Sequence, residues 1–341
     1  MTRKIGICYA SSDEYAPYSG ISLLSLLENN SQFVDNVYIL SFGIKSENKK
    51  KLQDMVEYYG CNFIFIDAIS VLEPIFILLN LNLYGGSYAT YARAFISDLI
   101  PNNNGKVLYV DSDTIVDGSI EELVHLDMDS PTKLYGAVIG TNQYTKGNNE
   151  INLTNGNSIY FACGVMLFNM KGWRDYNCSN LICEYINSHG SNYRYADQTI
   201  INNVIEEKFV IALHPKYNYW GHIYRGSRFW YQMTLGGFWH EKIIEEAKKT
   251  PVIIHYKGYI VHPWRKNNVS SLSNRFQYYK SISPWKNIPE YSIYYDFSQG
   301  KITKENKIKY NQQIRNLRYP PYVLSLLGTL SKIKHIFLCK K

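Results

Sequence analysis

The sequence has few cysteines, and none of them forms a recognisable site. Its six cysteines include no C-x-x-C pair, and the closest two, Cys178 and Cys183, lack the two further ligands that a zinc site requires. Their spacing is also too sparse for a disulfide-stapled domain. We therefore expect reduced thiols and a cytoplasmic location.

Long apolar runs are also absent. No stretch of about 20 consecutive apolar residues occurs, so the sequence predicts no transmembrane helix. The first ten residues, MTRKIGICYA, have a basic start but turn polar after a short apolar run, and we expect no signal peptide. With 45% hydrophobic and 19% charged residues, the 341-residue chain has the composition of a globular protein with a substantial core.

The positive charge is concentrated at the end of the chain. Residues 301–341 hold ten lysines and arginines against one glutamate, a net charge of +9, which leaves the first 300 residues at −2 within a total of +7. Leucines and aromatic residues accompany these cations, so we expect a basic amphipathic segment that lies on an anionic membrane surface. The alternative is a solvated helix that packs on the domain. We expect no nucleic-acid binding.

Short β-rich segments alternate with helical patterns along the first 110 residues. We predict strands at 4–10, 36–42, 61–67 and 106–110, and helices at 18–30, 46–60 and 86–101. This alternation predicts an α/β fold with a mostly parallel central sheet and right-handed crossovers. Further strands are expected at 134–140, 160–169, 209–213 and 251–256, and further helices near 170–188 and 196–207. The Asn- and Gly-rich segment 141–158 is typical of a long loop that serves as a lid or binding loop or is disordered.

Two acidic residues end the fourth predicted strand. Asp111 and Asp113 follow an apolar run, at the carboxyl edge where parallel sheets bind ligands. Neighbouring carboxylates repel each other, and burial adds to that cost, so a bound divalent cation would stabilise them. The competing interpretation is a helix N-cap. A second D-x-D, Asp127 and Asp129, follows a helical pattern instead, where a solvated or capping role is sufficient.

A histidine ends the last predicted strand. His255 begins the segment HYKGYIVHPW, in which Gly258 permits close approach of the backbone to a ligand and His262 precedes a Pro-Trp pair. A single histidine at a strand end is more often structural than a ligand. An imidazole beside two carboxylates, however, is a set that suits manganese.

Six segments in this order resemble glycosyltransferase family 8, the group that contains glycogenin and bacterial lipopolysaccharide galactosyl- and glucosyltransferases. They are CYASSDEYAPYSGISLLSLLENN, TYARAFISDLIP, KVLYVDSDTIVDGSIEEL, YFACGVMLFNMKGWR, YADQTIIN and HYKGYIVHPW. The resemblance covers roughly residues 4–265 and implies a GT-A nucleotide-sugar transferase fold. It implies a catalytic domain over 1–265, which leaves 266–341 as a C-terminal extension that we expect to be helical and basic. From the composition described above, we expect its tail from about 301 to associate with the membrane.

The resemblance also implies the ligands. It implies a UDP-glucose or UDP-galactose donor and a Mn²⁺ ion, with Mg²⁺ as the alternative, held by Asp111, Asp113 and His255. The implied donor-binding positions are Ala10, Ser11, Asp13, Tyr15, Arg93, Asp111, Ser112, Asp113, Gly258 and His262. Tyr15 would stack on the uracil base, or else pack at the start of a helix.

The segment YADQTI carries the residues nearest the chemistry. The resemblance implies retention of the anomeric configuration, with Gln198 beneath the donor sugar and Asp197 orienting its hydroxyl groups. Asp197 is also a candidate helix N-cap. Some relatives have a second aspartate where this chain has Thr199, so one carboxylate fewer is available as a nucleophile. We therefore favour front-face chemistry, in which the leaving phosphate deprotonates the acceptor, over a double displacement.

Three departures from the family pattern affect the donor site. The family lysine before Pro-Trp is His262 here, with one extra residue after Gly258, so the second phosphate cation is His262, Lys257 or missing. Ala162 stands where the family often has asparagine. The segment ASSD is less acidic than the usual A-x-D-D. These departures leave the identity of the sugar open.

These features together predict a metal-dependent, retaining hexosyltransferase. It would move glucose or galactose from a UDP-sugar to a glycan, glycolipid or glycoprotein acceptor in bacterial surface polysaccharide or glycoconjugate synthesis. A lipid-linked acceptor would place it on the inner face of the cell membrane. The alternatives are another sugar nucleotide, a catalytically silent nucleotide-sugar-binding protein of the same fold, and self-glycosylation, given the 31 tyrosines.

Overall fold

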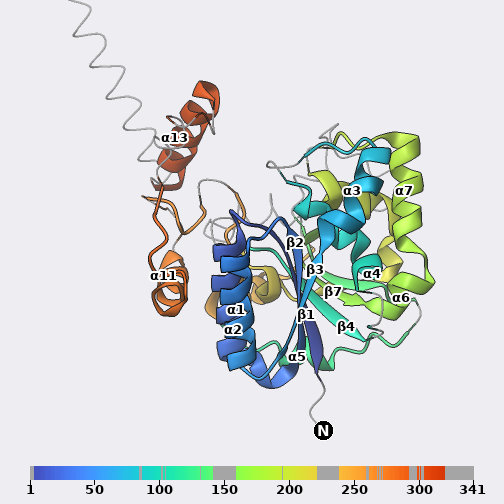
Figure 1. Cartoon of the computed structure of the whole chain (residues 1–341), viewed down its shortest axis with the longest axis horizontal. Helices are drawn as coiled ribbons and strands as arrows, with labels where there is room; N and C mark the ends of the chain where they lie inside the picture. Colours follow the sequence, from blue (N-terminus) through green and yellow to red (C-terminus); the bar gives the residue numbers. More distant parts are fainter. Residues whose placement is uncertain are drawn as a thin grey trace, which may run out of the picture.

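The computed structural model places one sheet between two layers of helices (Figure 1). It describes residues 4–318 except 84–86, 101, 102, 104, 131, 141–158, 194, 221–237, 259, 260, 267, 269, 271, 292–297, 299, 301 and 302. The predicted loop at 141–158 and the end of the predicted tail, 319–341, lie outside the described residues.

The central sheet has seven strands in the order β3-β2-β1-β4-β7-β6-β8. The strands are β1 (Ile5–Ser12), β2 (Val34–Phe42), β3 (Asn62–Asp67), β4 (Lys106–Val110), β6 (Tyr135–Ile139), β7 (Phe161–Asn169) and β8 (Val210–Leu213). The first four strands in this order are parallel, and β6 is parallel to β8. Only β7 runs antiparallel to its neighbours. The predicted, mostly parallel sheet is therefore confirmed.

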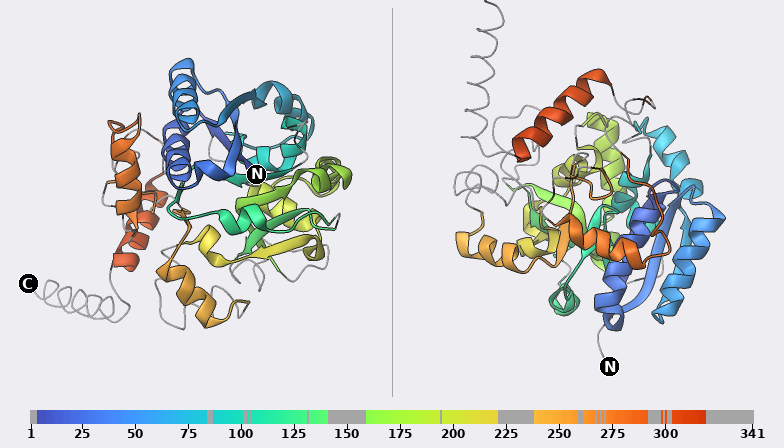
Figure 2. Two further views of the ribbon diagram at one scale, coloured as in Figure 1. Left: turned by 90° about the horizontal axis from the view of Figure 1, so that it is seen from below. Right: turned by 90° about the vertical axis from the view of Figure 1, so that its left-hand side faces the viewer.

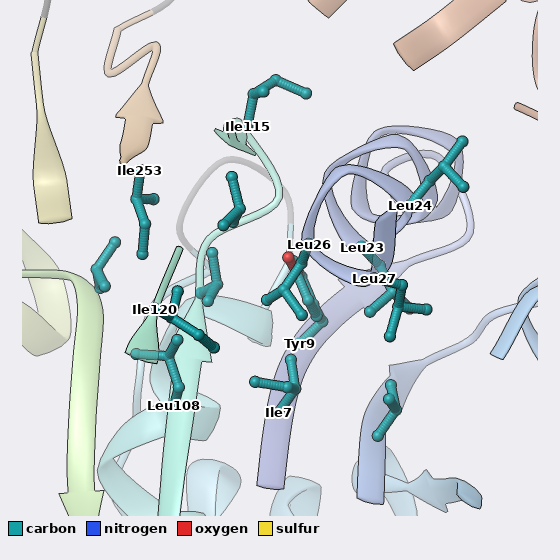
Figure 3. Packing of buried hydrophobic residues seen from close by; sticks show 14 of the residues in the cluster. Ile7, Tyr9, Leu23, Leu24, Leu26, Leu27, Leu108, Ile115, Ile120 and Ile253 are labelled. Atoms are coloured by element: carbon teal, nitrogen blue, oxygen red, sulfur yellow. The ribbon is translucent and has the colours of Figure 1, made fainter. Parts of the chain in front are cut away.

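Alternate side chains of β1 point into two separate cores because successive residues of a strand face opposite sides. Ile7 and Tyr9 pack under α1 (Ala16–Asn30), as Figure 3 shows, in a core that also takes in α2 (Ser46–Tyr58). Cys8 faces the other core. That core is covered by α3 (Ala68–Leu78), η2 (Ala89–Phe95), α4 (Ile96–Leu99), α6 (Met170–Asp175), α7 (Cys178–His189) and α8 (Ala196–Val204).

The predicted helix at 86–101 has a different form in the structure. The segment is the 3-10 helix η2 followed by the single turn of α4. All residues from Tyr91 to Phe95 are buried, so the segment lacks the solvent-facing side of an amphipathic helix. Tertiary packing therefore determines that this segment is a 3-10 helix, which the spacing of its apolar residues does not predict.

Several short elements did not stand out in the sequence. The helices α3 and α10 (Glu241–Lys249) had not been predicted, nor had the strand β5 (Thr114–Val116), whereas α5 (Glu121–His125) lies where the sequence has a helical pattern. The predicted strand at 251–256 is reduced to β9 (Ile253–His255). It pairs antiparallel with β5 in a separate two-stranded sheet.

The predicted domain boundary at residue 265 falls inside the packed unit. The helix α11 (Ser273–Ile282) lies against α1 (Figure 1), and Phe276 and Tyr279 belong to the same core as β1. Trp285 covers Gly20 so closely that a Cβ there would lie 2.1 Å from its ring. The compact body therefore continues to at least Trp285.

Beyond this body, α13 (Lys304–Arg318) forms a basic helix at one side of the molecule (Figure 2). Its sequence contains Lys304, Lys307, Lys309, Arg315 and Arg318 against Glu305, and Ile308 is exposed. The helical, basic character predicted for the extension is seen here. Within the described residues, no helix combines the length and the apolar character needed to cross a membrane.

Candidate active site

A cavity of about 450 Å³ lies at the carboxyl ends of β1 and β4. This is the edge at which a parallel sheet is expected to bind a ligand. The predicted site residues that line it are Ala10, Ser11, Tyr15, Arg93, Asp111, Ser112, Asp113, Asp197, Gln198, His255, Gly258 and His262. The cavity thus brings together every predicted site residue except Asp13.

The predicted metal ligands converge on one side of this cavity. Asp111, Asp113 and His255 each offer one ligand atom, and these atoms lie within 4.8 Å of one another. His255 Nε2 lies 3.1 Å from Asp113 Oδ1 and 4.0 Å from Asp111 Oδ2. Two carboxylates and one imidazole form a hard, partly nitrogenous donor set that fits manganese or magnesium.

The pairing of β5 with β9 brings the histidine to the acids. His255 is the register partner of Thr114, and Tyr256 N donates to Asp113 O at 2.9 Å. The ring is then oriented by Asn218, whose Oδ1 lies 2.8 Å from His255 Nδ1 and also accepts from Trp220 Nε1 at 2.8 Å. With its proton on Nδ1, His255 turns the lone pair of Nε2 toward the carboxylates, as a metal ligand must.

Gly164 on β7 provides the space for this cluster. A Cβ at this position would lie 2.3 Å from His255 Cε1 and 2.8 Å from Asp111 Oδ2. The backbone also takes part, because Asp111 N donates to Gly164 O at 2.8 Å. A side chain at position 164 would therefore displace two of the three candidate ligands.

Arg93 is buried between two carboxylates. Its Nη1 donates to Asp111 Oδ1 at 3.0 Å and to Cys163 O at 2.6 Å. Its Nε donates to Asp197 Oδ2, and its Nη2 donates to Thr90 Oγ1 at 2.8 Å. Burial alone would lower the pKa of Arg93, but the two carboxylates raise it well above its usual value. Arg93 therefore holds Asp111 and Asp197 in place, and the direct donor contact expected of it stays a prediction.

Asp113 faces a second imidazole. His262 Nε2 lies 3.4 Å from Asp113 Oδ2, and its ring stacks on Trp264 at 4.5 Å between centroids. The other neighbour of Trp264 is Tyr18, stacked at 3.9 Å. Burial acts to raise the pKa of Asp113, but His255 and His262 outweigh it and hold that pKa well below the usual range. Asp113 is thus kept ionised, as a metal ligand must be.

The predicted catalytic pair on α8 is firmly held. Asp197 is 1% exposed and accepts from both Arg93 and Thr90. Gln198 Oε1 accepts from Cys163 N at 3.0 Å, and its Nε2 donates to Tyr160 OH at 3.0 Å. Both side chains reach the cavity wall from fixed positions. The N-cap of α8 is Tyr195, so the alternative of a capping Asp197 is not what the structure has.

Beside the carboxyl end of β1, hydroxyl groups link β1, α1 and the D-x-D segment. Ser19 Oγ donates to Ser11 Oγ at 2.9 Å and lies 2.7 Å from Ser112 Oγ. Asp13 differs from its neighbours because it does not line the cavity. Its carboxylate accepts from Lys45 N and Asn48 Nδ2, both at 2.9 Å, and so serves the start of α2.

Tyr15 lies at the rim of the cavity and is 39% exposed. Its ring meets Tyr18 and Trp264 edge-on, at 5.8 Å and 6.4 Å between centroids. The structure therefore has the packing role left open for Tyr15, and stacking on a base stays a prediction.

Gly164, Asn218 and Trp220 are among the residues of the site that had not been singled out from the sequence. Gly164 lay within a quoted segment but read as an ordinary strand glycine, and isolated strand glycines do signal close approach. Asn218 and Trp220 lie in YNYW, where no spacing distinguishes them. Their roles come from the tertiary contact with His255, which sequence periodicity does not report.

The sheet and the acid–histidine cluster at its carboxyl edge define a glycosyltransferase of the GT-A type. The family model for glycosyl transferase family 8 matches residues 6–268. The chain therefore belongs to glycosyl transferase family 8.

Individual proteins resemble it over different lengths. A lipopolysaccharide 1,2-glucosyltransferase of Escherichia coli is 27% identical over 339 residues, which cover 96% of this chain and 89% of that protein. A Haemophilus influenzae protein is 28% identical over 220 residues, 64% of each. The solved structure of the galactosyltransferase LgtC with donor and acceptor sugar analogues matches with a TM-score of 0.67 and 24% identity. That match covers 87% of this chain and all (100%) of the other. The structural likeness shows the shared fold.

Proposed function

We propose that this family 8 glycosyltransferase transfers glucose or galactose from a UDP-sugar with retention of configuration. The observation that carries the proposal is the Asp111, Asp113 and His255 cluster, which opens into a cavity large enough for a nucleotide sugar. The names of the relatives support a hexose, because they include a glucosyltransferase and a galactosyltransferase. When bound, a divalent cation at this cluster acts as a Lewis acid on the diphosphate of the donor.

Other residues of the cavity would position the donor and the metal ligands. Arg93 fixes the carboxylates of Asp111 and Asp197 through a guanidinium fork. Ser11 and Ser112 present hydroxyl groups and backbone to the ribose side of the cavity. Gln198 forms the wall beneath the expected position of the sugar. Preorganised groups of this kind lower the barrier because they need no rearrangement during the reaction.

The environment of Asp197 favours front-face chemistry over a double displacement. A carboxylate nucleophile must reach the anomeric carbon, but Asp197 is ion-paired with Arg93 and almost completely buried. Thr199, where some relatives have a second aspartate, lies 3.1 Å from Tyr160 OH and offers no carboxylate. The leaving phosphate is then the base that accepts the proton of the acceptor hydroxyl.

The decisive experiment measures UDP release from purified protein with Mn²⁺ and either UDP-glucose or UDP-galactose. We expect release with one of them that is lost with EDTA and restored by Mn²⁺. The anomeric configuration of the product, read by NMR, tests retention. Absence of UDP release with every UDP-sugar would leave the catalytically silent alternative. A mass increase of the protein itself, in steps of one hexose, would point to self-glycosylation.

We further propose that the acceptor belongs to a bacterial surface glycan or glycoconjugate, and that the protein works as a peripheral protein on the inner face of the cell membrane. The lysines of α13, of which Lys304 and Lys309 are exposed and Lys307 is half-buried, support this because each basic residue near an anionic surface adds about 1 kcal/mol of attraction. Substitution of Lys304, Lys307 and Lys309 by Gln should weaken binding to vesicles of anionic lipid while UDP release continues. Equal binding of the two proteins would refute the role of α13.

A further inference from the structure

The cavity contains two carboxylates of the metal cluster and must also accept the two negative phosphates of a donor. Besides the imidazoles of His255 and His262, the cationic side chains among the described residues of its wall are Arg93 and Lys257. His255 belongs to the metal cluster. The remaining question is which of Arg93, His262 and Lys257 faces the diphosphate.

The N–H groups of Arg93 are already used within the protein. Each nitrogen of the guanidinium donates to at least one protein oxygen, and the partners include the charged groups of Asp111 and Asp197. A cation that neutralises two carboxylates contributes little net charge to a further anion.

His262 is fixed toward the metal cluster. Its ring is stacked on Trp264 with 24° between the planes, and Trp264 is itself stacked on Tyr18. This stack sets the plane of the imidazole and directs Nε2 to Asp113 Oδ2 at 3.4 Å. The contact suits a group that orients Asp113, in the way that outer hydrogen bonds orient metal ligands.

Lys257 approaches the cavity from a different direction. Along the extended segment after β9 the side chains alternate: His255 faces the cavity, Tyr256 points away and donates to Leu272 O at 2.7 Å, and Lys257 faces the cavity again. Its Nζ lies 4.4 Å from the ring centroid of Trp220 and 5.6 Å from that of Tyr195. Aromatic faces hold an ammonium group by cation–π attraction, so Trp220 and Tyr195 fix the position of Lys257 Nζ beside the cavity.

Trp220 connects this lysine to the metal cluster. Its indole Nε1 donates to Asn218 Oδ1, the same oxygen that orients His255, and its ring meets that of His255 edge-on at 6.4 Å. The position of the ammonium is thus tied to the position of the metal ligands. Gly258, with φ of +111°, follows directly and lets the backbone turn beside the cavity.

We propose that Lys257 is the cation that binds the diphosphate of the donor and of the departing UDP, and that His262 is a positioning residue for Asp113. The inference rests on the proposed use of a UDP-sugar. The contact with the diphosphate is thereby assigned to Lys257, which stands between His255 and Gly258 in the chain, and not to His262, which lies five positions later.

The test compares the affinities for UDP and for uridine, which differ only in the diphosphate, by calorimetry on the full chain with Mn²⁺. We expect Lys257→Met to weaken UDP binding about 10- to 100-fold, the range for a charge-assisted hydrogen bond, and to leave uridine binding unchanged. Lys257→Arg should restore most of the loss. Lys216→Met is the matched control, because Lys216 also lies over an aromatic ring but outside the cavity.

His262→Gln should behave differently in the same assay. We expect a higher Mn²⁺ concentration for half-maximal UDP binding, with the UDP-to-uridine ratio retained at saturating Mn²⁺. If Lys257→Met keeps its UDP affinity while His262→Gln loses the UDP-to-uridine difference, His262 is the phosphate cation and the inference is wrong. If the unmodified protein binds UDP no better than uridine, the proposed UDP-sugar function fails first, and the inference with it.

Discussion

The chain contains two D-x-D segments that look alike in sequence and differ in every structural respect. Asp111 and Asp113 are partly buried beside a histidine at the carboxyl edge of the sheet. Asp127 and Asp129 are exposed, and Asp127 Oδ1 accepts from the backbone N–H of Asp129 at 3.0 Å, a local turn. A pair of acids thus becomes a candidate metal site through its place in the sheet and through its neighbours.

We expect the largest effect on activity when the charge of Asp111 or Asp113 is removed. Asp111→Asn or Asp113→Asn should lower transfer by about 10³-fold, because a bound metal contributes several kcal/mol to the stabilisation of the leaving group. Steady-state rates with saturating UDP-sugar measure this loss. Circular dichroism should show an intact fold. Activity within a few-fold of the unmodified protein would mean that the metal, if required at all, binds elsewhere.

The second prediction concerns the space that Gly164 leaves beside Asp111 and His255. Gly164→Ala would place a methyl group 2.3 Å from the His255 ring, so the ligand atoms must move by a substantial fraction of an ångström. Misplacement on this scale costs about 10²-fold in rate. The control is Gly105→Ala, whose nearest contact would be the Asn103 side chain at 3.3 Å. Equal rates for both alanine variants would show that the cluster tolerates displacement.

A smaller effect should follow when the orientation of His255 is disturbed. Asn218→Leu removes the oxygen that accepts from His255 and Trp220, and we expect Mn²⁺ affinity to fall about 10- to 100-fold. Asn218→Asp keeps the acceptor and should retain most of the affinity. Calorimetric titration of Mn²⁺ separates the two variants. The same loss in both would trace the effect to packing instead.

We expect the smallest effect on activity and stability when Asp127 or Asp129 is changed. Asp127→Asn and Asp129→Asn should change transfer less than twofold and the free energy of unfolding by no more than about 0.5 kcal/mol, as surface substitutions usually do. Thermal unfolding and steady-state rates measure both quantities. A loss here as large as at Asp111 would reverse the comparison between the two segments.

Much of this contrast could be predicted from the sequence because strand periodicity places Asp111 and Asp113 at the end of β4. The same reasoning located His255 at the end of a strand, although the strand is shorter than expected. The contacts that join these parts could not be predicted. The pairing of β5 with β9 involves three residues on each side, too few for a periodic pattern, and Asn218 acquires its role only through distance in space.

Asp13 and Arg93 show that the partners of a charged side chain cannot be predicted from its type and its place in the chain. Both carry charges at the expected places in the chain, yet Asp13 bonds to the start of α2 and Arg93 is enclosed by protein acceptors. Residue type and order identify a charged group near a site. The direction in which that group donates or accepts depends on neighbours from distant parts of the chain.

The register of Thr114 with His255 also bears on how the protein is made. The strands β1, β2 and β3 come from the first 67 residues and pair with one another, so they can associate early in synthesis. His255, the third residue of the candidate cluster, is translated almost 190 residues later, and contacts between residues so far apart form slowly. A chain that ends between Asp113 and His255 therefore has the two acids but lacks the complete candidate cluster.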